Sequence, residues 1–309
     1  MESKTACLFC GSTNTRESFY PEVRFNNRVF VYQECRNCRL NFNDPLLNGD
    51  DYNALYPLEY HDEFYFKIKK DYSKQLFIVK KYEDIKSVVD YGCGDAGLLD
   101  VLSRNGYLCT GVEYSSSLVE RLKKQYPAIR FYTVEEFSRQ PDRYDCIHLG
   151  DVLEHMTNPN QTIQDLRGKL NENGYLFVEG PIEHNTSLAY GFRKMIFKIR
   201  KRLQPGRQVD GRPYHTFLAN RKNQQDMLEK NLLTRRYFKI YETGWPFPEK
   251  IKDCTSIKKT LEYIIAQVSI FGSLFFPAAG NRFYYIGQVK SKGNKNQEPN
   301  FKNQINSKL

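Results

Sequence analysis

Short apolar runs alternate with segments of helical periodicity along the chain. Seven of these runs are bounded by turn residues and rich in β-branched or aromatic side chains, which is typical of strands. They cover residues 87–91, 108–113, 129–132, 145–149, 175–179, 238–242 and 283–289. Helical patterns separate the first five, so we predict parallel βαβ units with right-handed crossovers. The expected fold is α/β, with a ligand site at the carboxyl ends of the strands.

A glycine-rich loop, DYGCGDAG, joins the first predicted strand to the next helix. Its glycines, Gly92, Gly94 and Gly97, allow a sharp turn and a close approach of the backbone to a ligand. The second strand ends in Glu113, and an acid about 20 residues after such a loop is placed to bind ribose hydroxyls. The glycines fit the dinucleotide fingerprint, but Asp90 ahead of them does not belong to it. An ordinary tight turn is the alternative.

The sequence VVDYGCGDAGLL resembles the first motif of class I S-adenosylmethionine-dependent methyltransferases. Two later segments, RYDCIHLGDVLEHMTNP and LNENGYLFVEGP, are similar to the fourth- and fifth-strand segments of the same family. One glycine that is usual in the family is Ala96 here. The resemblance covers residues 84–181. It implies a Rossmann-like, seven-stranded class I methyltransferase sheet that binds S-adenosyl-L-methionine.

This resemblance also implies which residues bind the cofactor. In the family the loop backbone lies against the amino-acid part of the cofactor, and the early acid helps to hold it. The expected residues are Asp90, Gly92, Gly94, Glu113, Tyr114, Gly150 and Asp151. Tyr114 would flank the adenine. After the third strand the family often has an acid that reaches the adenine, and Glu135 and Glu136 both remain open for this role.

The first sixty residues contain two C-x-x-C knuckles, Cys7 with Cys10 and Cys35 with Cys38. Four thiolates on two tight turns can close a tetrahedron around Zn²⁺, and such a site leaves no open position for catalysis. We therefore predict a structural zinc; four buried or redox-active cysteines are the alternative. The stretch VRFNNRVFVYQE, with its central Asn-Asn, predicts the hairpin of a small zinc ribbon. Similar four-cysteine modules precede the methyltransferase domain of bacterial sugar C-methyltransferases and their uncharacterised relatives.

Two further segments resemble the acceptor-binding parts of those sugar enzymes. LNFNDPLLNGDDYNALYPLEYH is similar to their bridge into the catalytic domain, and would bring Tyr56 and Tyr60 to the substrate. GRPYHTFLANRKNQQDMLEKNLL is similar to a segment in which a histidine faces the acceptor; here that residue is His215. Histidine suits a base near neutral pH, so the catalytic candidates are His215, then His155, then Tyr60. The alternatives are a surface role for His215 and a packing role for His155.

The resemblance implies transfer of a methyl group to a small-molecule acceptor. We expect a sugar or glycan intermediate of surface-polysaccharide or secondary-metabolite biosynthesis. The sugar C-methyltransferases carry an acid just before the acceptor-facing histidine, where this chain has Tyr214, so O-, C- and N-methylation all stay open. An RNA methyltransferase with a zinc-ribbon substrate-binding module is the alternative, although GDVLEH differs from the [DN]PP[YF] motif used on base amines. A third hypothesis is a non-catalytic zinc-ribbon binding protein.

The net charge of +10 is concentrated in residues 192–209, which contain seven cations and no acid, with apolar residues interleaved. This pattern predicts a basic amphipathic helix. It is either a solvated face or a contact for an anionic substrate, an anionic membrane surface or nucleic acid. The most apolar stretch, 263–279, is short and polar for a spanning helix. We expect it to pack in the core, with membrane-surface contact as the alternative.

The chain length of 309 residues allows one large domain and one small one. We predict a zinc-ribbon module (1–60), a connecting helix (61–85), a methyltransferase domain (86–287) with a substrate-pocket insertion (181–236), and a disordered basic tail (288–309). No apolar segment follows Met1, and the chain contains eight cysteines. We therefore expect no secretory signal and a reducing, cytoplasmic location.

Overall fold

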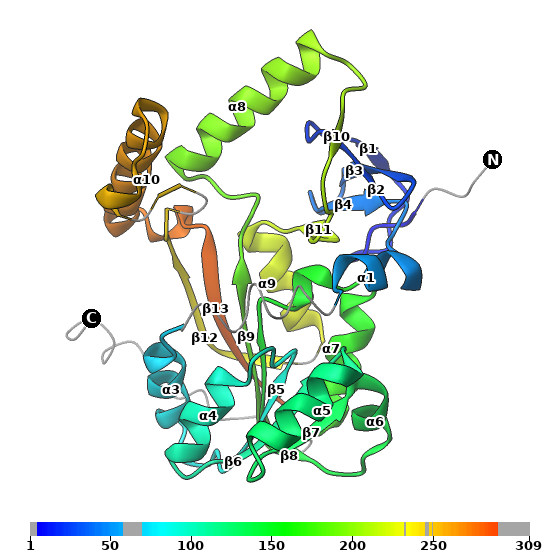
Figure 1. Cartoon of the computed structure of the whole chain (residues 1–309), viewed down its shortest axis with the longest axis vertical. Helices are drawn as coiled ribbons and strands as arrows, with labels where there is room; N and C mark the ends of the chain where they lie inside the picture. The colour runs from blue at the N-terminus through cyan, green and yellow to red at the C-terminus, as the bar shows by residue number, and fades with distance from the viewer. Residues whose placement is uncertain (1–4, 58–69, 232, 245–246, 249, 290–309) are drawn as a thin grey trace.

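The computed structural model describes residues 5–57, 70–231, 233–244, 247–248 and 250–289, and is built around two sheets (Figure 1). Tyr60 and the rest of segment 58–69 lie outside the described residues, as does the predicted tail from residue 290 onward. The described part of the predicted connecting helix is α3 (Ser73–Lys80), which ends before residue 85. The prediction that the tail begins at residue 288 is wrong, because Gln288 and Val289 belong to strand β13.

The larger sheet has seven strands in the order β12-β13-β9-β8-β5-β6-β7. Its five parallel strands are β5 (Ser87–Tyr91), β6 (Leu108–Glu113), β7 (Arg130–Thr133), β8 (Tyr144–Gly150) and β9 (Leu170–Pro181). β13 (Arg282–Val289) runs antiparallel to β9 and to β12 (Leu233–Tyr241). The predicted seven-stranded Rossmann-like sheet is confirmed.

Helices cover both faces of this sheet. One face carries α3, α4 (Gly97–Arg104) and α5 (Ser116–Gln125); the other carries α6 (Val134–Arg139), α7 (Pro159–Gly168) and α9 (Arg221–Lys230). Neighbouring strand residues point to opposite faces, so Val88 packs in one core cluster and Val89 in the other. Because both faces are covered, most residues of the central strands are buried, including Val88, Val89 and Asp90 of β5.

The N-terminal module is a second, smaller sheet. It contains β1 (Thr15–Glu17), β2 (Glu22–Phe25), β3 (Arg28–Cys35) and β4 (Asn41–Asp44), followed by the helix α1 (Gly49–Leu55). β2 and β3 form the predicted hairpin. Its turn residues Asn26 and Asn27 have φ angles of 49° and 59°, and two positive φ angles are what a type I′ turn requires.

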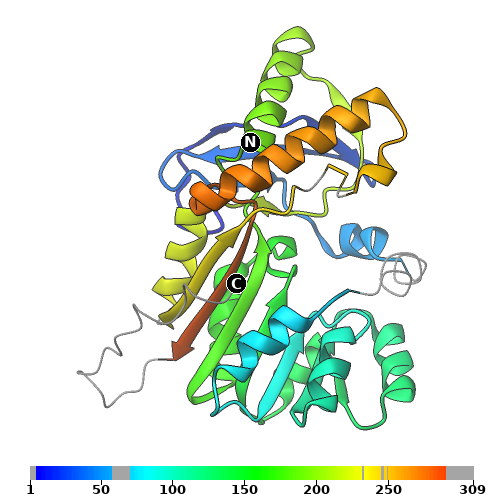
Figure 2. The same ribbon diagram turned by 90° about the vertical axis from the view of Figure 1, so that its left-hand side faces the viewer.

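Two short strands from the insertion complete this smaller sheet. β10 (Gln208–Asp210) pairs with β2, and β11 (Phe217–Leu218) pairs with β4. The order is β10-β2-β3-β4-β11, with β1 paired to β3. The module lies over the carboxyl ends of the parallel strands, where Figure 2 shows it above the larger sheet. Residues far apart in the sequence therefore meet at the expected ligand-binding edge.

The predicted basic helix is α8 (Leu188–Leu203), which begins four residues earlier and ends six residues sooner than residues 192–209. It begins at Leu188 because the Ser187 side chain accepts a hydrogen bond from the backbone N–H of Tyr190. It ends before Pro205 and Gly206, residue types that terminate helices. Residues 208 and 209, predicted as the end of this helix, belong to β10 instead.

The helix α10 (Ile257–Phe275) contains most of the apolar stretch 263–279, and the prediction that this stretch packs in the core is wrong. Only Ala266 and Ser269 of the helix are buried, while Phe271 and Leu274 are 63% and 71% exposed. The buried side consists of small residues: a Cβ added to Gly244 would lie 2.9 Å from that of Ala266. Apolar content alone did not show which side faces the protein.

None of the helices in the described part of the chain combines the length and the apolar content needed to cross a bilayer. The described residues also form three single 3₁₀ turns, at Leu153–His155, Ile251–Asp253 and Pro277–Ala279. The first of them follows β8 directly and lies beneath the smaller sheet, where it carries the predicted catalytic residue His155.

Candidate active site and cysteine cluster

The loop between β5 and α4 depends on two glycines with a left-handed backbone. Gly92 and Gly94 have φ angles of 82° and 52°, and a Cβ on Gly92 would lie 2.4 Å from Cγ2 of Val152. The Glu113 carboxylate accepts hydrogen bonds from the backbone N–H groups of Gly94, at 3.0 Å, and Tyr114, at 2.7 Å. The glycine loop and Glu113 are therefore connected directly by a hydrogen bond. The remaining carboxylate lone pairs can accept hydrogen bonds from a ligand.

A cavity of about 560 Å³ opens at the carboxyl ends of β5, β8 and β9, and its size is typical of small-molecule sites. The predicted cofactor-binding residues that line it are Asp90, Gly92, Gly94, Gly150 and Asp151. Glu113 is not among the lining residues, but its carboxylate accepts a hydrogen bond from Gly94, which is. Tyr114 is 56% exposed and lies beside Tyr52, with ring centroids 6.2 Å apart. The structure therefore brings five of the seven residues to one cavity.

The two acids left open for the adenine both have local partners. Glu136 forms a capping box with Thr133 at the start of α6. Glu135 pairs with Arg139 on the same helix. Neither acid lines the cavity as the described residues define it, so the structure does not single out an adenine-binding acid.

A buried histidine that the sequence analysis did not single out also lines the cavity. Nδ1 of His148, on β8, is 2.7 Å from Oδ1 of Asp90, and its Nε2 is 3.1 Å from Oε1 of Glu179 on β9. Burial alone would lower the pKa of His148, but the two carboxylates outweigh it and raise the pKa to about 10. His148 is therefore positively charged at neutral pH and fixes Asp90. Its only sequence signal is a polar side chain inside the otherwise apolar run of residues 146–149.

His215, predicted to face the acceptor, lies beside a carboxylate that the sequence analysis missed. Its Nδ1 forms an ion pair with Oε2 of Glu183, at 2.9 Å. Burial would lower the pKa of His215, but the charge of Glu183 outweighs it and raises the pKa to about 9. At neutral pH the imidazole is thus protonated and must lose a proton before it can act as a base. Nothing in the local sequence distinguishes Glu183.

His155 lies edge-on to His215, with ring centroids 5.0 Å apart. Its Nδ1 is 2.6 Å from the carbonyl oxygen of Tyr214, and because a carbonyl only accepts, Nδ1 carries the proton. The hydroxyl of Tyr56 is 3.2 Å from the same nitrogen. Burial, followed by the charge of His215, lowers the pKa of His155 to about 4. His155 is therefore neutral at pH 7, and its Nε2 presents a lone pair.

Asp151 connects the cavity to the two histidines. Its Oδ1 accepts a hydrogen bond from Nη2 of Arg282, at 2.6 Å, and both residues line the cavity. Burial, followed by the charge of Asp151, raises the pKa of the nearby Glu154 to about 8. The polar atoms of Glu154, His155 and His215 all lie within 4.8 Å of one another. The cavity and the histidine pair are therefore neighbours.

Strands of the N-terminal module hold the backbone at His215. The hydroxyl of Tyr32, on β3, and the side-chain amide of Asn43, on β4, both donate to the carbonyl oxygen of His215, at 2.8 and 3.2 Å. The backbone N–H of Asn43 donates to the carbonyl of Thr216, and the N–H of Thr216 donates to the carbonyl of Glu154. Module and insertion thus build the histidine site together. The sequence analysis missed Tyr32 and Asn43.

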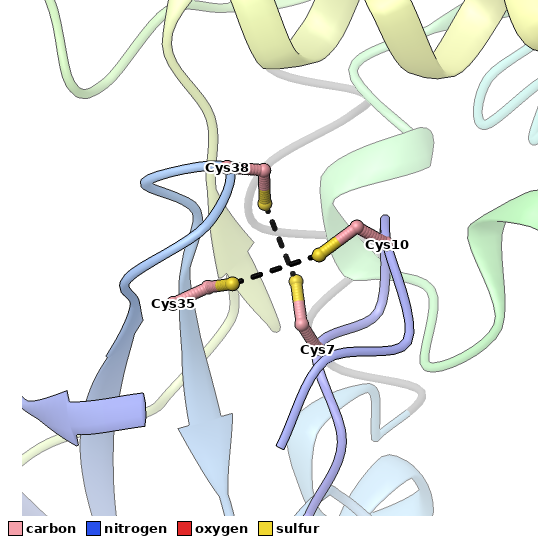
Figure 3. Close-up of side chains that lie close together, drawn as sticks. All are labelled: Cys7, Cys10, Cys35 and Cys38. Atoms are coloured by element: carbon pink, nitrogen blue, oxygen red, sulfur yellow. Dashed lines mark hydrogen bonds between the residues drawn. The ribbon is translucent and has the colours of Figure 1, made fainter. Parts of the chain in front are cut away.

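The four cysteines of the two knuckles point toward a common centre (Figure 3). The Sγ atoms of Cys7 and Cys38 are 3.5 Å apart, and those of Cys10 and Cys35 are 3.6 Å apart. All four sulfur atoms lie within 4.8 Å of one another. A tetrahedral zinc ion with bonds of about 2.3 Å needs sulfur–sulfur separations of about 3.8 Å. The donor set and its spacing therefore fit zinc.

A family model described as "Methyltransferase domain" matches residues 61–234, more than half of the chain. The chain is also similar to the ubiquinone biosynthesis O-methyltransferase of Glaesserella parasuis serovar 5 (strain SH0165). The two are 32% identical over an alignment of 104 residues, and the match covers 30% of this chain and 44% of that protein. The protein of the same name from Coxiella burnetii (strain Dugway 5J108-111) is 31% identical over an alignment of 98 residues, and this match covers 30% of this chain and 42% of that protein.

The chain therefore spans less than half the length of these relatives. Among solved structures, it is similar to magnesium protoporphyrin IX methyltransferase from Synechocystis PCC 6803, which contains bound SAH. The TM-score is 0.44 and the sequence identity 15%, and the match covers 70% of this chain and 80% of that one.

Proposed function

Because this chain belongs to the methyltransferase domain family, we propose that it transfers a methyl group from S-adenosylmethionine to a hydroxyl group of a small-molecule acceptor. One observation carries the proposal: the cavity at the glycine loop adjoins the His155–His215 pair through Asp151 and Glu154. A methyl donor in the cavity would thus lie close to groups that can take a proton from an acceptor.

On the donor side, Asp90 and Glu113 are the acids that would bind the cofactor. S-adenosylmethionine, when bound, supplies the electrophilic methyl group. Glu113 would accept hydrogen bonds from ribose hydroxyls, while His148 holds the Asp90 side chain in place. Because the loop glycines have no side chains, the donor could approach the loop backbone closely. In this proposal the chain binds and orients the donor.

On the acceptor side, His215 would take the proton of the attacking hydroxyl. Methyl transfer is an in-line displacement, so the acceptor oxygen must be held opposite the leaving sulfur. The oxygen–methyl bond would form as the sulfur–methyl bond breaks, and the hydroxyl proton would pass to Nε2, since Nδ1 faces Glu183. Glu183 would stabilise the resulting imidazolium, as carboxylates beside catalytic histidines do. The neutral His155 is the second candidate for this role.

For the acceptor itself we propose a sugar or glycan intermediate. The support is the similarity of the four-cysteine module and of the His215 segment to sugar methyltransferases, together with the polar groups around His215. The two named relatives are O-methyltransferases of ubiquinone biosynthesis, which favours oxygen as the methylated atom. A ubiquinone precursor is therefore the rival acceptor.

A transfer assay with isotopically labelled S-adenosylmethionine tests both parts of this proposal. The acceptors to compare are a panel of nucleotide sugars and glycan intermediates, a ubiquinone precursor, and ribosomal RNA. Label in the sugar panel alone supports the proposal. Label only in the ubiquinone precursor would contradict a sugar acceptor, but would still support methyl transfer from S-adenosylmethionine. Label in RNA would favour an RNA methyltransferase. A protein that does not bind S-adenosylmethionine at all would overturn the function.

We also propose that Cys7, Cys10, Cys35 and Cys38 hold one structural Zn²⁺. The support is their spacing, which suits a tetrahedral ion, and a set of four sulfur donors, which suits zinc. The ion would connect the loop before β1 to the turn between β3 and β4. In this proposal residues 5–57 and the strands β10 and β11 form one structural unit.

Replacing Glu113 with alanine should raise the Kd for S-adenosylmethionine by about 10- to 100-fold. The variant loses a carboxylate that would bind the ribose and that holds the glycine loop through Gly94, and charge-assisted hydrogen bonds contribute about 1.5–3 kcal/mol. Isothermal titration calorimetry measures the change. Glu120→Ala removes an exposed carboxylate of α5 that pairs only with Lys123 among the described residues and should leave the Kd unchanged. An unaltered Kd in Glu113→Ala would remove Glu113 from the cofactor site.

A further inference from the structure

Two neighbouring helices carry regular stripes of exposed apolar side chains. The α10 stripe consists of Ile257, Leu261, Ile264, Val268, Phe271 and Phe275. The α8 stripe consists of Leu188, Phe192, Met195, Ile199 and Leu203. Their members recur every three or four residues, which places each set on one side of its helix. Each of these side chains is about half exposed or more, so both stripes face solvent.

The two helices lie together on the outside of the molecule. They contact one another and stand apart from the helices that cover the larger sheet (Figures 1 and 2). Each packs on the protein through a different side: Phe197 of α8 lies against Tyr20 of the module, with ring centroids 5.8 Å apart, and Ala266 of α10 lies at Gly244. The stripes lie on the sides of the two helices that do not take part in this packing.

The charges beside the stripes are all of one sign on α8. The helix carries Arg193, Lys194, Lys198, Arg200, Lys201 and Arg202 and no acid. Among the ion pairs of the described residues, Lys201 alone of these six has a partner, Glu17. α10 has no charged residue after Glu262. The combined surface is therefore apolar and cationic, with little acidic charge to offset it.

We propose that α8 and α10 dock on the surface of a bilayer that contains anionic lipid. Helices of this kind bury their apolar side at the boundary of headgroups and acyl chains, and place Lys and Arg among anionic headgroups. Neither helix can span the bilayer, so contact is with the surface. The inference does not rest on the proposed methyl transfer.

Other occupants fit the same surface less well. A second copy of the chain would bring a second cationic helix, and like charges repel. Nucleic acid would match the cations of α8, because such binding is dominated by phosphate contacts. It would leave the α10 stripe without an apolar partner. Anionic lipid matches both features at once.

Co-sedimentation with vesicles tests the proposal without any methyl donor or acceptor. The full chain should bind vesicles of phosphatidylcholine with about a third phosphatidylglycerol, should bind pure phosphatidylcholine much more weakly, and should lose binding as salt rises. Replacing Lys198, Arg200 and Arg202 with glutamine should lower partitioning by about 100-fold. Replacing Val268, Phe271 and Phe275 with serine should also abolish most of the binding, since the buried apolar area is lost.

Matched variants elsewhere on the surface serve as controls. The first control replaces the exposed Lys86, Lys124 and Lys239 with glutamine, which changes the net charge by the same amount as the α8 variant. The second replaces the exposed Phe77 and Leu108 with serine, which removes comparable apolar side chains. Neither control variant should alter vesicle binding. The proposal is overturned if the full chain ignores anionic vesicles. It is also overturned if the α8 variant binds as the parent does, or if the α10 stripe instead mediates a dimer in analytical ultracentrifugation.

Discussion

Alanine in place of His215 is expected to lower turnover by about 10²–10⁴-fold, the range for loss of a general base. Affinity for S-adenosylmethionine should hardly change, because the residues that line the cavity come from the larger sheet, its loops and the segment around the start of α3, and do not include His215. His215 is held for this task by Glu183 at its ring and by Tyr32 and Asn43 at its backbone. Steady-state kinetics on the identified acceptor, with calorimetry for the donor, measure the two effects separately.

The pH–rate profile separates a base from a structural residue. A base acts in its deprotonated form, so turnover should rise as the pH rises through the raised pKa of His215, about 9. Glu183→Gln removes the carboxylate that raises this pKa and keeps the burial that lowers it. The rising limb should therefore move to lower pH. A limb that does not move in Glu183→Gln belongs to another group.

His184→Ala is the matched control for this prediction. His184 lies in the same insertion, and its Nδ1 forms a hydrogen bond with the side-chain amide of Asn41. The turnover of this variant therefore shows how much the loss of any imidazole from the insertion affects the enzyme. Near-normal turnover in His215→Ala would transfer the role to the neutral His155. Collapse of cofactor binding would instead show that His215 is structural, and that the acceptor lies elsewhere.

The larger sheet could be predicted because its signals are local. β5 and β6 agree with the predicted residues at both ends, since buried parallel strands are apolar runs that stop at turn residues. β10 and β11 could not be predicted in this way. They have three and two residues, and they pair with strands more than a hundred residues earlier in the chain. Only the folded module provides a partner for such short segments.

The residues of the candidate site also divide into those with a local sequence signal and those without one. Gly92, Gly94 and Glu113 form a motif with fixed spacing, so the sequence predicts their meeting. His148, Glu183 and Tyr32 belong to no motif, and each acquires its place only from a partner on another strand or loop. The prediction that the apolar stretch of α10 packs in the core was wrong for a related reason. Periodicity locates an apolar face of a helix but does not say whether the protein itself or a partner covers that face.

Serine in place of Cys35 is expected to abolish the zinc content, from one ion per chain, and to lower turnover by about 100-fold or more. A tetrahedral site that loses one thiolate binds zinc poorly, and such ions contribute folding free energy locally. Cys35 ends β3, the strand that carries Tyr32 and therefore the hydrogen bond to the His215 carbonyl. Affinity for S-adenosylmethionine should be largely retained, because no residue of the module lines the cavity among those described.

Two further variants show whether zinc acts through this connection. Cys254→Ser removes a thiol outside the cluster, so zinc content and turnover should both stay unchanged. Tyr32→Phe keeps the four thiolates but removes one hydrogen bond to the His215 carbonyl, so it should keep the zinc and lower turnover by about tenfold. Elemental analysis of protein purified without chelator gives the zinc content. If Cys35→Ser loses its zinc and still turns over normally, the module does not position His215; if the parent contains no zinc, the four thiols have another role.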